Sequence, residues 1–265
     1  MNGNKYDHDE KYDFQGFGEK GERFSKWFEN YWYHYKWHTI ITLFFAIVIG
    51  VCGYQFITRE VPDVYVMYAG PEYLSAGDVI SFKSAIRDNI DDYNEDGEKG
   101  MTLITLTCVS EAKLEALESE AEAESQELYV DLAANAQNIK QFDMEIFAGE
   151  AVVCLLDPSL YERVHAEGGF MKMTDLFTEE ELAELELYDD CGIYLHSTKF
   201  GKYYSVMSSL PDDTVLCIRK ISTISVFKGK KKYEKLHDYH VDMFKNIVNF
   251  EYPEGYVPET EDVTE

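Results

Sequence analysis

The sequence predicts an α/β protein, with a largely parallel sheet and crossover helices behind one N-terminal transmembrane helix. Two observations support this fold class. The first is a run without any charged residue from Thr39 to Ile57, and the second is an alternation of strand-like and helix-like stretches along the remaining chain. Such alternation is typical of parallel sheets, because parallel neighbouring strands need a long crossover connection.

The run over residues 39–57 (TIITLFFAIVIGVCGYQFI) is apolar or weakly polar on every face. As a helix it would be about 28 Å long, close to the hydrocarbon thickness of a bilayer of about 30 Å. A helix in a soluble core would instead carry a polar face. We therefore predict a transmembrane helix. A cleavable signal peptide is the alternative, but 38 residues precede the run and no A-x-A-like cleavage site follows it.

The flanks of this run predict its orientation. Four basic residues lie within about 20 residues before it, whereas Arg59 is the only one in the comparable stretch after it, and positive charge stays on the cytoplasmic side. We expect a single-pass protein of the cell membrane, with its N-terminus cytoplasmic and its C-terminal domain extracytoplasmic. Residues 24–38 are basic and aromatic, as suits the headgroup layer. Residues 1–23 are expected to be a disordered cytoplasmic tail.

Apolar and β-branched runs predict the first strands of the exterior domain at residues 63–68, 101–109 and 151–156. Helices are expected between them. Residues 75–91 place apolar side chains at helical spacing, and residues 110–138 are rich in Ala, Glu and Leu without Gly or Pro. A short helix over residues 137–147 should end at Gly149.

The second half of the exterior domain shows a different mixture of signals. A helix is expected from Pro158, which suits the first helical position, and another from Thr178, which has Glu181 at capping-box spacing. Residues 191–206 alternate around Gly201 and predict a β-hairpin with a longer loop. The remaining expected elements are a strand over 213–222, a helix over 233–250 and an acidic disordered tail over 252–265.

The predicted extracytoplasmic α/β domain, residues 61–251, lies in a strongly acidic part of the chain. After Thr58 there are 18 Lys and Arg against 43 Asp and Glu, a net charge of about −25. This field repels phosphate backbones and anionic lipid headgroups, so it argues against nucleic acid as a partner. It favours cationic ligands or serves solubility, and it should keep the exterior domain monomeric.

Four cysteines follow the predicted span, at Cys108, Cys154, Cys191 and Cys217, and no CxxC or Cys/His metal spacing occurs. Three of them stand inside apolar strand-like runs, where a free cysteine packs as a small hydrophobic residue. Structural disulfides are the alternative, and four cysteines allow three pairings. The core interpretation is favoured over a disulfide.

Residues 92–97 (DYNEDG) match the first half of the calcium-loop pattern D-x-[DN]-x-[DN]-G, in which Asp92, Asn94 and Asp96 would supply oxygen ligands. The second half of the pattern fails, because Leu103 stands where a bidentate Glu is needed. Asp and Asn beside Gly also make tight turns. A turn is therefore favoured over a calcium site.

The sequence carries no catalytic signature. It has no G-x-S-x-G, no H-E-x-x-H, no Walker loop and no G-x-G-x-x-G after a strand. We therefore expect no enzyme, no catalytic residue, no cofactor and no metal site. His237 and His240 have the i, i+3 spacing of a metal-binding pair on a helix, but a solvated helix face is favoured for them.

The order of elements, and in particular residues 142–177 (FDMEIFAGEAVVCLLDPSLYERVHAEGGFMKMTDLF), resembles the extracytoplasmic solute-binding proteins of bacterial ABC transporters. The segments CGIYLHST and HVDMFKNIVNF resemble a following strand and the closing helix of that family. The resemblance covers about 190 residues and consists of patterns. It implies one solute-binding-protein-like lobe, because members of the family usually have two lobes and a longer exterior part.

Two functions from different classes follow. The favoured one is a non-catalytic binding or assembly module, anchored by one span and acting through contacts with another envelope protein or a transporter component. The alternative is a solute- or calcium-responsive sensor related to the solute-binding proteins of ABC transporters.

Overall fold

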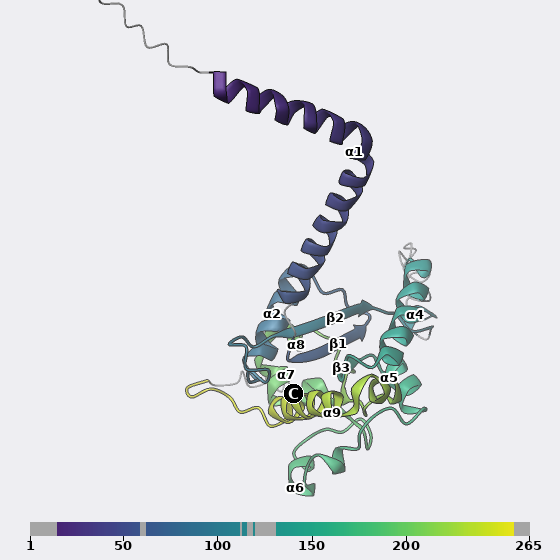
Figure 1. The fold of residues 1–265 in the computed structure, drawn as a ribbon. Helices are drawn as coiled ribbons and strands as arrows, with labels where there is room; N and C mark the ends of the chain where they lie inside the picture. Colours follow the sequence, from purple (N-terminus) through teal and green to yellow (C-terminus); the bar gives the residue numbers. More distant parts are fainter. Residues whose placement is uncertain (1–14, 59–61, 112, 116–118, 120–130, 257–265) are drawn as a thin grey trace, which may run out of the picture. The chain divides into compact units, whose positions relative to one another are not determined.

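The computed structural model describes residues 15–58, 62–111, 113–115, 119 and 131–256. The chain forms two units, Met1–Glu60 and Val61–Glu265. The first unit contains the helix α1 (Gln15–Ile57), and the second contains a five-stranded sheet with helices on both faces (Figure 1). The elements of the second unit are β1 (Val64–Gly70), α2 (Ala76–Arg87), β2 (Met101–Thr107), α4 (Leu132–Ala148), β3 (Val153–Leu156), α5 (Pro158–His165), η1 (Met173–Asp175), α6 (Glu179–Leu182), β4 (Gly192–Tyr194), η2 (Leu195–Ser197), α7 (Lys199–Tyr203), α8 (Ser205–Ser208), β5 (Val215–Ile218) and α9 (Thr223–Val248).

Helix α1 contains the charge-free run of the sequence. Its segment Lys26–Ile57 is long and apolar enough to cross a membrane. The side chains from Ile40 to Ile57 are exposed, which suits an apolar solvent better than a soluble core. The helix begins at Gln15, so the prediction of disorder is wrong for residues 15–23, whereas residues 1–14 lie outside the described part of the chain.

The sheet has the strand order β2-β1-β3-β5-β4 and is mostly parallel. Strand β1 pairs in parallel with β2 on one side and with β3 on the other, so that Val66 lies opposite both Leu103 and Val153. Strand β5 runs antiparallel to β3 and to β4, its two neighbours. The predicted α/β class and largely parallel sheet are therefore confirmed, and the reversed direction of β5 is a feature that the sequence did not indicate.

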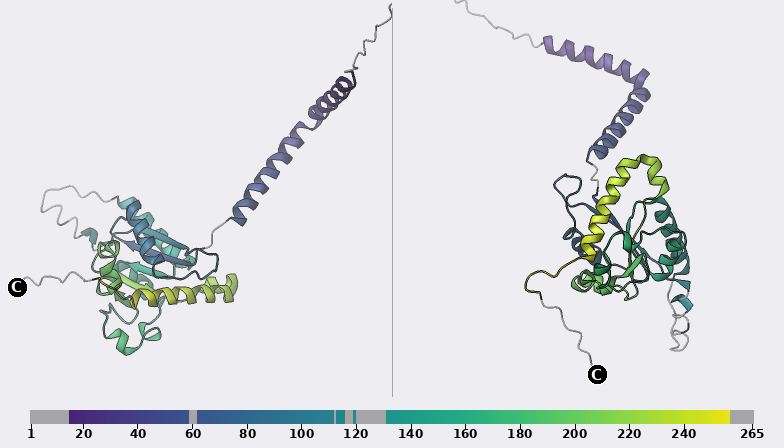
Figure 2. Two further views of the ribbon diagram at one scale, coloured as in Figure 1. Left: turned by 90° about the vertical axis from the view of Figure 1, so that its left-hand side faces the viewer. Right: turned by 90° about the horizontal axis from the view of Figure 1, so that it is seen from below.

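Both faces of the sheet are covered, as the near-continuous apolar strand runs require. One face packs against α2, α7, α8 and α9, and the other packs against α4 and α5. Within β1, Val66 and Tyr68 belong to the first core, whereas Met67 and Ala69 belong to the second. Figure 2 shows α9, in yellow, as the long helix along one side of this unit.

Several helix ends have local causes that the sequence had indicated. Asp157 is the N-cap of α5 and Pro158 its first residue, and the side chain of Asp157 accepts a hydrogen bond from the Ser159 N–H. Gly149 ends α4 in the left-handed conformation, with φ of 74°. Thr178 caps α6 together with the Glu181 side chain, although this helix is only 4 residues long.

The predicted hairpin over residues 191–206 is wrong. Strand β4 ends at Tyr194, and η2, α7 and α8 follow it. The Thr198 hydroxyl group donates to the carbonyl oxygen of Leu195 and accepts from the Gly201 N–H, which starts a helix instead of a turn. A Cβ at Gly201 would lie 2.2 Å from the Leu195 oxygen, so this glycine permits close packing of two backbone segments.

The helix expected over most of residues 110–138 is confirmed where the structure describes it, because residues 111, 113–115, 119 and 132–138 are helical. A new helix, α4, begins at Leu132, because Asp131 has an extended backbone and its side chain accepts the N–H groups of Ala133 and Ala134. The expected short helix over 137–147 is the second part of α4. Residues 116–118 and 120–130, and the end of the predicted acidic tail at 257–265, lie outside the described residues.

Candidate functional site

The candidate site lies at the carboxyl edge of the sheet, where β1 and β3 end side by side. The helices that follow these two strands, α2 after β1 and α5 after β3, cover opposite faces of the sheet, so the chain connections diverge at this point. In open α/β sheets this edge is the usual place for ligands. Charged side chains from three separate segments meet here, those of Lys113 after β2, Asp157 after β3 and Asp213 before β5, and Glu72 follows β1 at the same edge.

Asp157 is the buried centre of this group. Its side chain is only 2% exposed. One carboxylate oxygen accepts the N–H and the hydroxyl of Ser159, at 3.0 and 2.6 Å, as the N-cap of α5. The other accepts the ammonium group of Lys113 at 2.7 Å. The helix N-terminus and the lysine together compensate a carboxylate that would otherwise be costly to bury.

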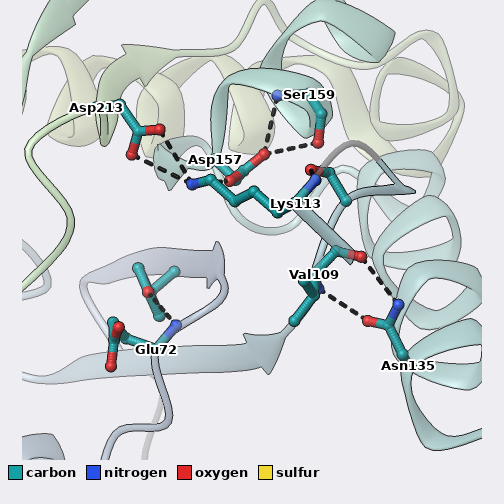
Figure 3. A network of polar contacts seen from close by, with 9 residues as sticks. Glu72, Val109, Lys113, Asn135, Asp157, Ser159 and Asp213 are labelled. Carbon is teal, nitrogen blue, oxygen red and sulfur yellow. Dashed lines mark hydrogen bonds and ion pairs between the residues drawn. The ribbon is translucent and has the colours of Figure 1, made fainter. Parts of the chain in front are cut away.

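Lys113 joins two carboxylates that are far apart in the sequence. Its Nζ lies 2.7 Å from Asp157 and 3.0 Å from Oδ2 of Asp213 (Figure 3). Asp213 is about half exposed, so its side of the ion pair faces solvent. Burial acts to lower the pKa of Lys113, but the hydrogen bonds to Asp157 and Asp213 outweigh burial and raise it. The ammonium group therefore stays charged at neutral pH.

The segment that carries Lys113 is attached to α4 by a buried amide. Asn135 accepts the Val109 N–H at 2.8 Å and donates to the Val109 carbonyl oxygen at 2.9 Å. Asn138 donates to the carbonyl oxygen of Thr107, the last residue of β2. These three bonds fix the direction in which the chain leaves β2, and thereby direct Lys113 towards the end of β3.

On the β1 side, the edge is formed by Tyr68 and Glu72. The Tyr68 hydroxyl accepts the Glu72 N–H at 3.2 Å, and its ring lies against Gly70, where a Cβ would be 2.8 Å from the hydroxyl oxygen. Burial, and secondarily the charges of Glu72, Asp157 and Asp213, raise the pKa of Tyr68. Tyr68 thus stays protonated and contributes a neutral hydroxyl group.

The charge of the edge is negative overall. Asp157 and Asp213 both pair with the ammonium of Lys113, which leaves one negative charge, and Glu72, whose charge acts on Tyr68 together with theirs, adds a second. Asp213 and Glu72 are the solvent-accessible members. This arrangement can hold a positively charged group from solution, and it would repel an anion.

The predicted calcium loop lies elsewhere, between α2 and β2. Asp92 accepts the N–H groups of Asp96 and Gly97, Asn94 accepts that of Asp96, and Asp96 accepts that of Glu98. Side-chain oxygens that bond to backbone N–H groups a few residues ahead are typical of Asx turns. The geometry supports the turn interpretation that the sequence favoured.

The expected solvated face for His237 and His240 is wrong, because both side chains are buried. His237 Nε2 is 2.8 Å from the carbonyl oxygen of Arg219. His240 Nε2 accepts the Tyr65 N–H at 2.8 Å, and its Nδ1 is 2.7 Å from the Leu236 carbonyl oxygen. The two histidines therefore join α9 to the sheet and point to separate partners, so they do not form a metal pair.

The four cysteines after α1 are free and buried, as the core interpretation expects. Cys154 and Cys217 lie opposite each other on β3 and β5. Burial raises the pKa of Cys154 to about 12 and that of Cys108 to about 11. Thiols that keep their protons at neutral pH are poor nucleophiles.

The sequence analysis placed the end of a strand and the start of a helix at Asp157 and Pro158, but it did not identify Lys113 or Asp213 as site residues. Lys113 is 44 residues from Asp157 and 100 residues from Asp213. A usable signal existed, because parallel strands end at one edge of a sheet and polar residues that follow them therefore meet. That signal would have selected Lys113 and Asp157. It would not have selected Asp213, because this residue precedes an antiparallel strand and does not follow a parallel one.

Comparisons with known proteins found no match to this chain. No family model matches this chain, and neither a curated protein nor a solved structure matches it. The resemblance to solute-binding proteins therefore remains a proposal.

Proposed function

We propose that this chain is a membrane-anchored, non-catalytic binding module whose exterior domain is one solute-binding-protein-like lobe. The observation that carries the proposal is the group of Lys113, Asp157 and Asp213 at the divergence of β1 and β3. Charged residues gathered at this edge from segments far apart in sequence are typical of a ligand site in α/β folds. The span-length apolar helix α1 supports the anchor.

The chemistry of the edge favours a small solute that carries an ammonium or guanidinium group. Asp213 and Glu72 present accessible carboxylates, and the edge keeps two uncompensated negative charges after Lys113 is counted. The surrounding domain is also acidic, which raises the local concentration of cationic solutes. Tyr68 offers a neutral hydroxyl at the same edge.

The protonation states support a binding role without catalysis. Lys113 is held as an ammonium by two carboxylates, so it does not act as a base. Cys108, which follows β2, has a pKa raised to about 11 by burial and, secondarily, by nearby carboxylates. Enzyme sites usually contain a base or nucleophile whose pKa is shifted towards neutrality, and the described residues of this edge show the opposite trend.

Calorimetry of the full-length protein in detergent tests the ligand class. Putrescine and arginine are the cationic probes, and glutamate is the anionic one. Asp213→Asn should weaken binding of the cationic probes roughly fivefold, since a half-exposed ion pair is worth about 1 kcal/mol. Asp212→Asn is the matched control, because it removes the same charge from an exposed neighbouring residue.

Two results would count against cation binding at this edge. One is the absence of heat with both cationic probes at millimolar concentration. The other is an equal loss of affinity in Asp213→Asn and Asp212→Asn, which would indicate a general effect of net charge.

A second candidate, assembly with another envelope protein, is favoured by one separate observation. Met144 and Phe147 on α4 are 56% and 71% exposed, and they are spaced three residues apart on one helix face. A photoreactive residue at position 147 should then crosslink a partner in intact cells. Crosslinking no stronger than from the exposed position Glu150 would refute this form of the proposal.

The proposed topology has the N-terminus in the cytoplasm and the domain outside. It rests on the excess of basic residues before the span over those after it. A cysteine placed after Tyr252 should react with an impermeant thiol reagent on intact cells, and one placed near Asn4 should be protected. Reversed labelling would refute the extracytoplasmic assignment.

A further inference from the structure

A second group of polar side chains lies at the opposite, amino-terminal edge of the sheet. His165 is the last residue of α5, and Asp189, Asp190 and Cys191 directly precede β4. One ligand atom from each of these four residues lies within 4.8 Å of the other three. Because α5 starts at the carboxyl edge and spans about 12 Å, this group is separate from the Lys113 site.

We propose that His165, Asp189, Asp190 and Cys191 form a binding site for a divalent metal ion, with Zn²⁺ as the expected occupant. The group offers one imidazole nitrogen, one sulfur and two carboxylate oxygens. Imidazole and thiolate ligands select zinc and its neighbours in the transition series, whereas calcium and magnesium prefer sites made of oxygen.

The spacing of the ligand atoms agrees with a tetrahedral ion. Nε2 of His165 lies 3.7 Å from Oδ2 of Asp189 and 3.6 Å from Oδ1 of Asp190. The Cys191 sulfur lies 3.4 Å from the same Asp190 oxygen. Bonds of 2.0–2.3 Å at tetrahedral angles place neighbouring ligand atoms roughly 3.3–3.6 Å apart. These three spacings differ from these values by only a few tenths of an ångström, and all the ligand atoms lie within 4.8 Å of one another.

Supporting partners orient both carboxylates towards the common centre. Oδ1 of Asp189 accepts the Tyr161 hydroxyl at 2.6 Å and the Cys191 N–H at 2.7 Å, so its Oδ2 is the oxygen nearest His165. Oδ2 of Asp190 accepts Lys172 at 2.6 Å, and Oδ1 faces the group. Hydrogen bonds of this kind hold metal ligands in place in known sites.

The ring contacts and the charge also fit a divalent ion. The imidazole of His165 stacks on the Tyr161 ring, with centroids 5.5 Å apart, which fixes its plane. Two carboxylates and a thiolate carry three negative charges, and a divalent ion with the ammonium of Lys172 balances them. The site would therefore be electrically neutral when filled.

Cobalt titration of the full-length protein in detergent tests the proposal. Tetrahedral Co²⁺ with a thiolate ligand gives intense visible bands and a sulfur-to-metal charge-transfer band in the near ultraviolet. We expect one equivalent of Co²⁺ to produce both signals and Zn²⁺ to remove them. Cys191→Ser should abolish the charge-transfer band, whereas Cys52→Ser, which removes an exposed thiol of α1, should leave it unchanged.

A second variant covers the case in which Cys191→Ser does not fold, as judged by circular dichroism. Asp190→Asn alters a half-exposed side chain and should weaken Co²⁺ binding at least tenfold, since even the supporting partners of a ligand typically account for about 10–100-fold. Weak octahedral spectra in the wild type, or unchanged binding in folded Cys191→Ser or in Asp190→Asn, would overturn the proposal.

Discussion

His240 should make the stability of the unit Val61–Glu265 depend on pH between about 6.5 and 4. The side chain is fully buried, accepts the Tyr65 N–H through Nε2, and contacts the Leu236 carbonyl oxygen through Nδ1. This pair of bonds requires the neutral ring, with its proton on Nδ1. A second proton would meet the Tyr65 N–H and could not be accommodated without breaking the link between α9 and β1.

The size of this loss of stability follows from the shift in the pKa of His240. Burial lowers the pKa of His240 from 6.5 to about 4. Between these two values the unfolded chain binds a proton that the folded chain does not, so stability is fully present above pH 6.5 and is lost as the pH falls to 4. At 1.36 kcal/mol for each pH unit, the loss amounts to about 3 kcal/mol.

Urea unfolding of the full-length protein at a series of pH values measures this effect. Circular dichroism must follow the transition, because all three tryptophans lie in α1 and would not report on the domain. His240→Gln should be less stable at pH 7, and its deficit relative to wild type should shrink by about 3 kcal/mol at pH 4. His38→Gln, which removes an exposed histidine of α1, should parallel the wild type. A deficit that is constant with pH would refute the neutral, buried assignment of His240.

Three further outcomes are expected. Val153→Asp places a charge at a fully buried position of β3 and should lower the stability by several kcal/mol in a thermal melt followed by circular dichroism. Ile80→Asp, at a position 70% exposed, should change the stability by less than about 0.5 kcal/mol. Equal melting temperatures for the two variants would contradict the burial of Val153 in the core. Residues 61–265 should fold alone as a monomer with a cooperative melt, because both faces of the sheet are covered within this unit, and aggregation of this fragment would argue for a required partner. Calcium should bind at millimolar affinity or weaker, so a melting temperature raised by micromolar calcium and restored to its original value in Asp92→Ala would contradict the turn interpretation.

Local features of the structure could be predicted from the sequence. The run at residues 151–156 is apolar at every position, and β3 is buried on both faces. Gly149 and Asp157-Pro158 mark the end of one helix and the start of the next, because their backbone preferences and side-chain bonds act over a few residues. The charge-free run in α1 can likewise be recognised from its composition alone as a helix long and apolar enough to cross a membrane.

The direction of β5 and the fate of residues 195–208 were decided by the tertiary structure. A short apolar strand has the same pattern whether it pairs in parallel or antiparallel, so VLCI gave no sign that it would run against β3. The alternation around Gly201 suggested a hairpin, but this glycine is present because the Leu195 backbone packs against it. A contact of this kind has no periodicity that a sequence pattern could reveal.

The sites depend most on tertiary structure. His240 and Tyr65 are 175 residues apart, and Lys113 and Asp213 are 100 residues apart. The sequence determined which segments are buried strands and helices, because burial is recorded in the spacing of apolar residues. Only the folded chain decided which polar side chains meet, because their meeting depends on strand order and on the face that each connection crosses.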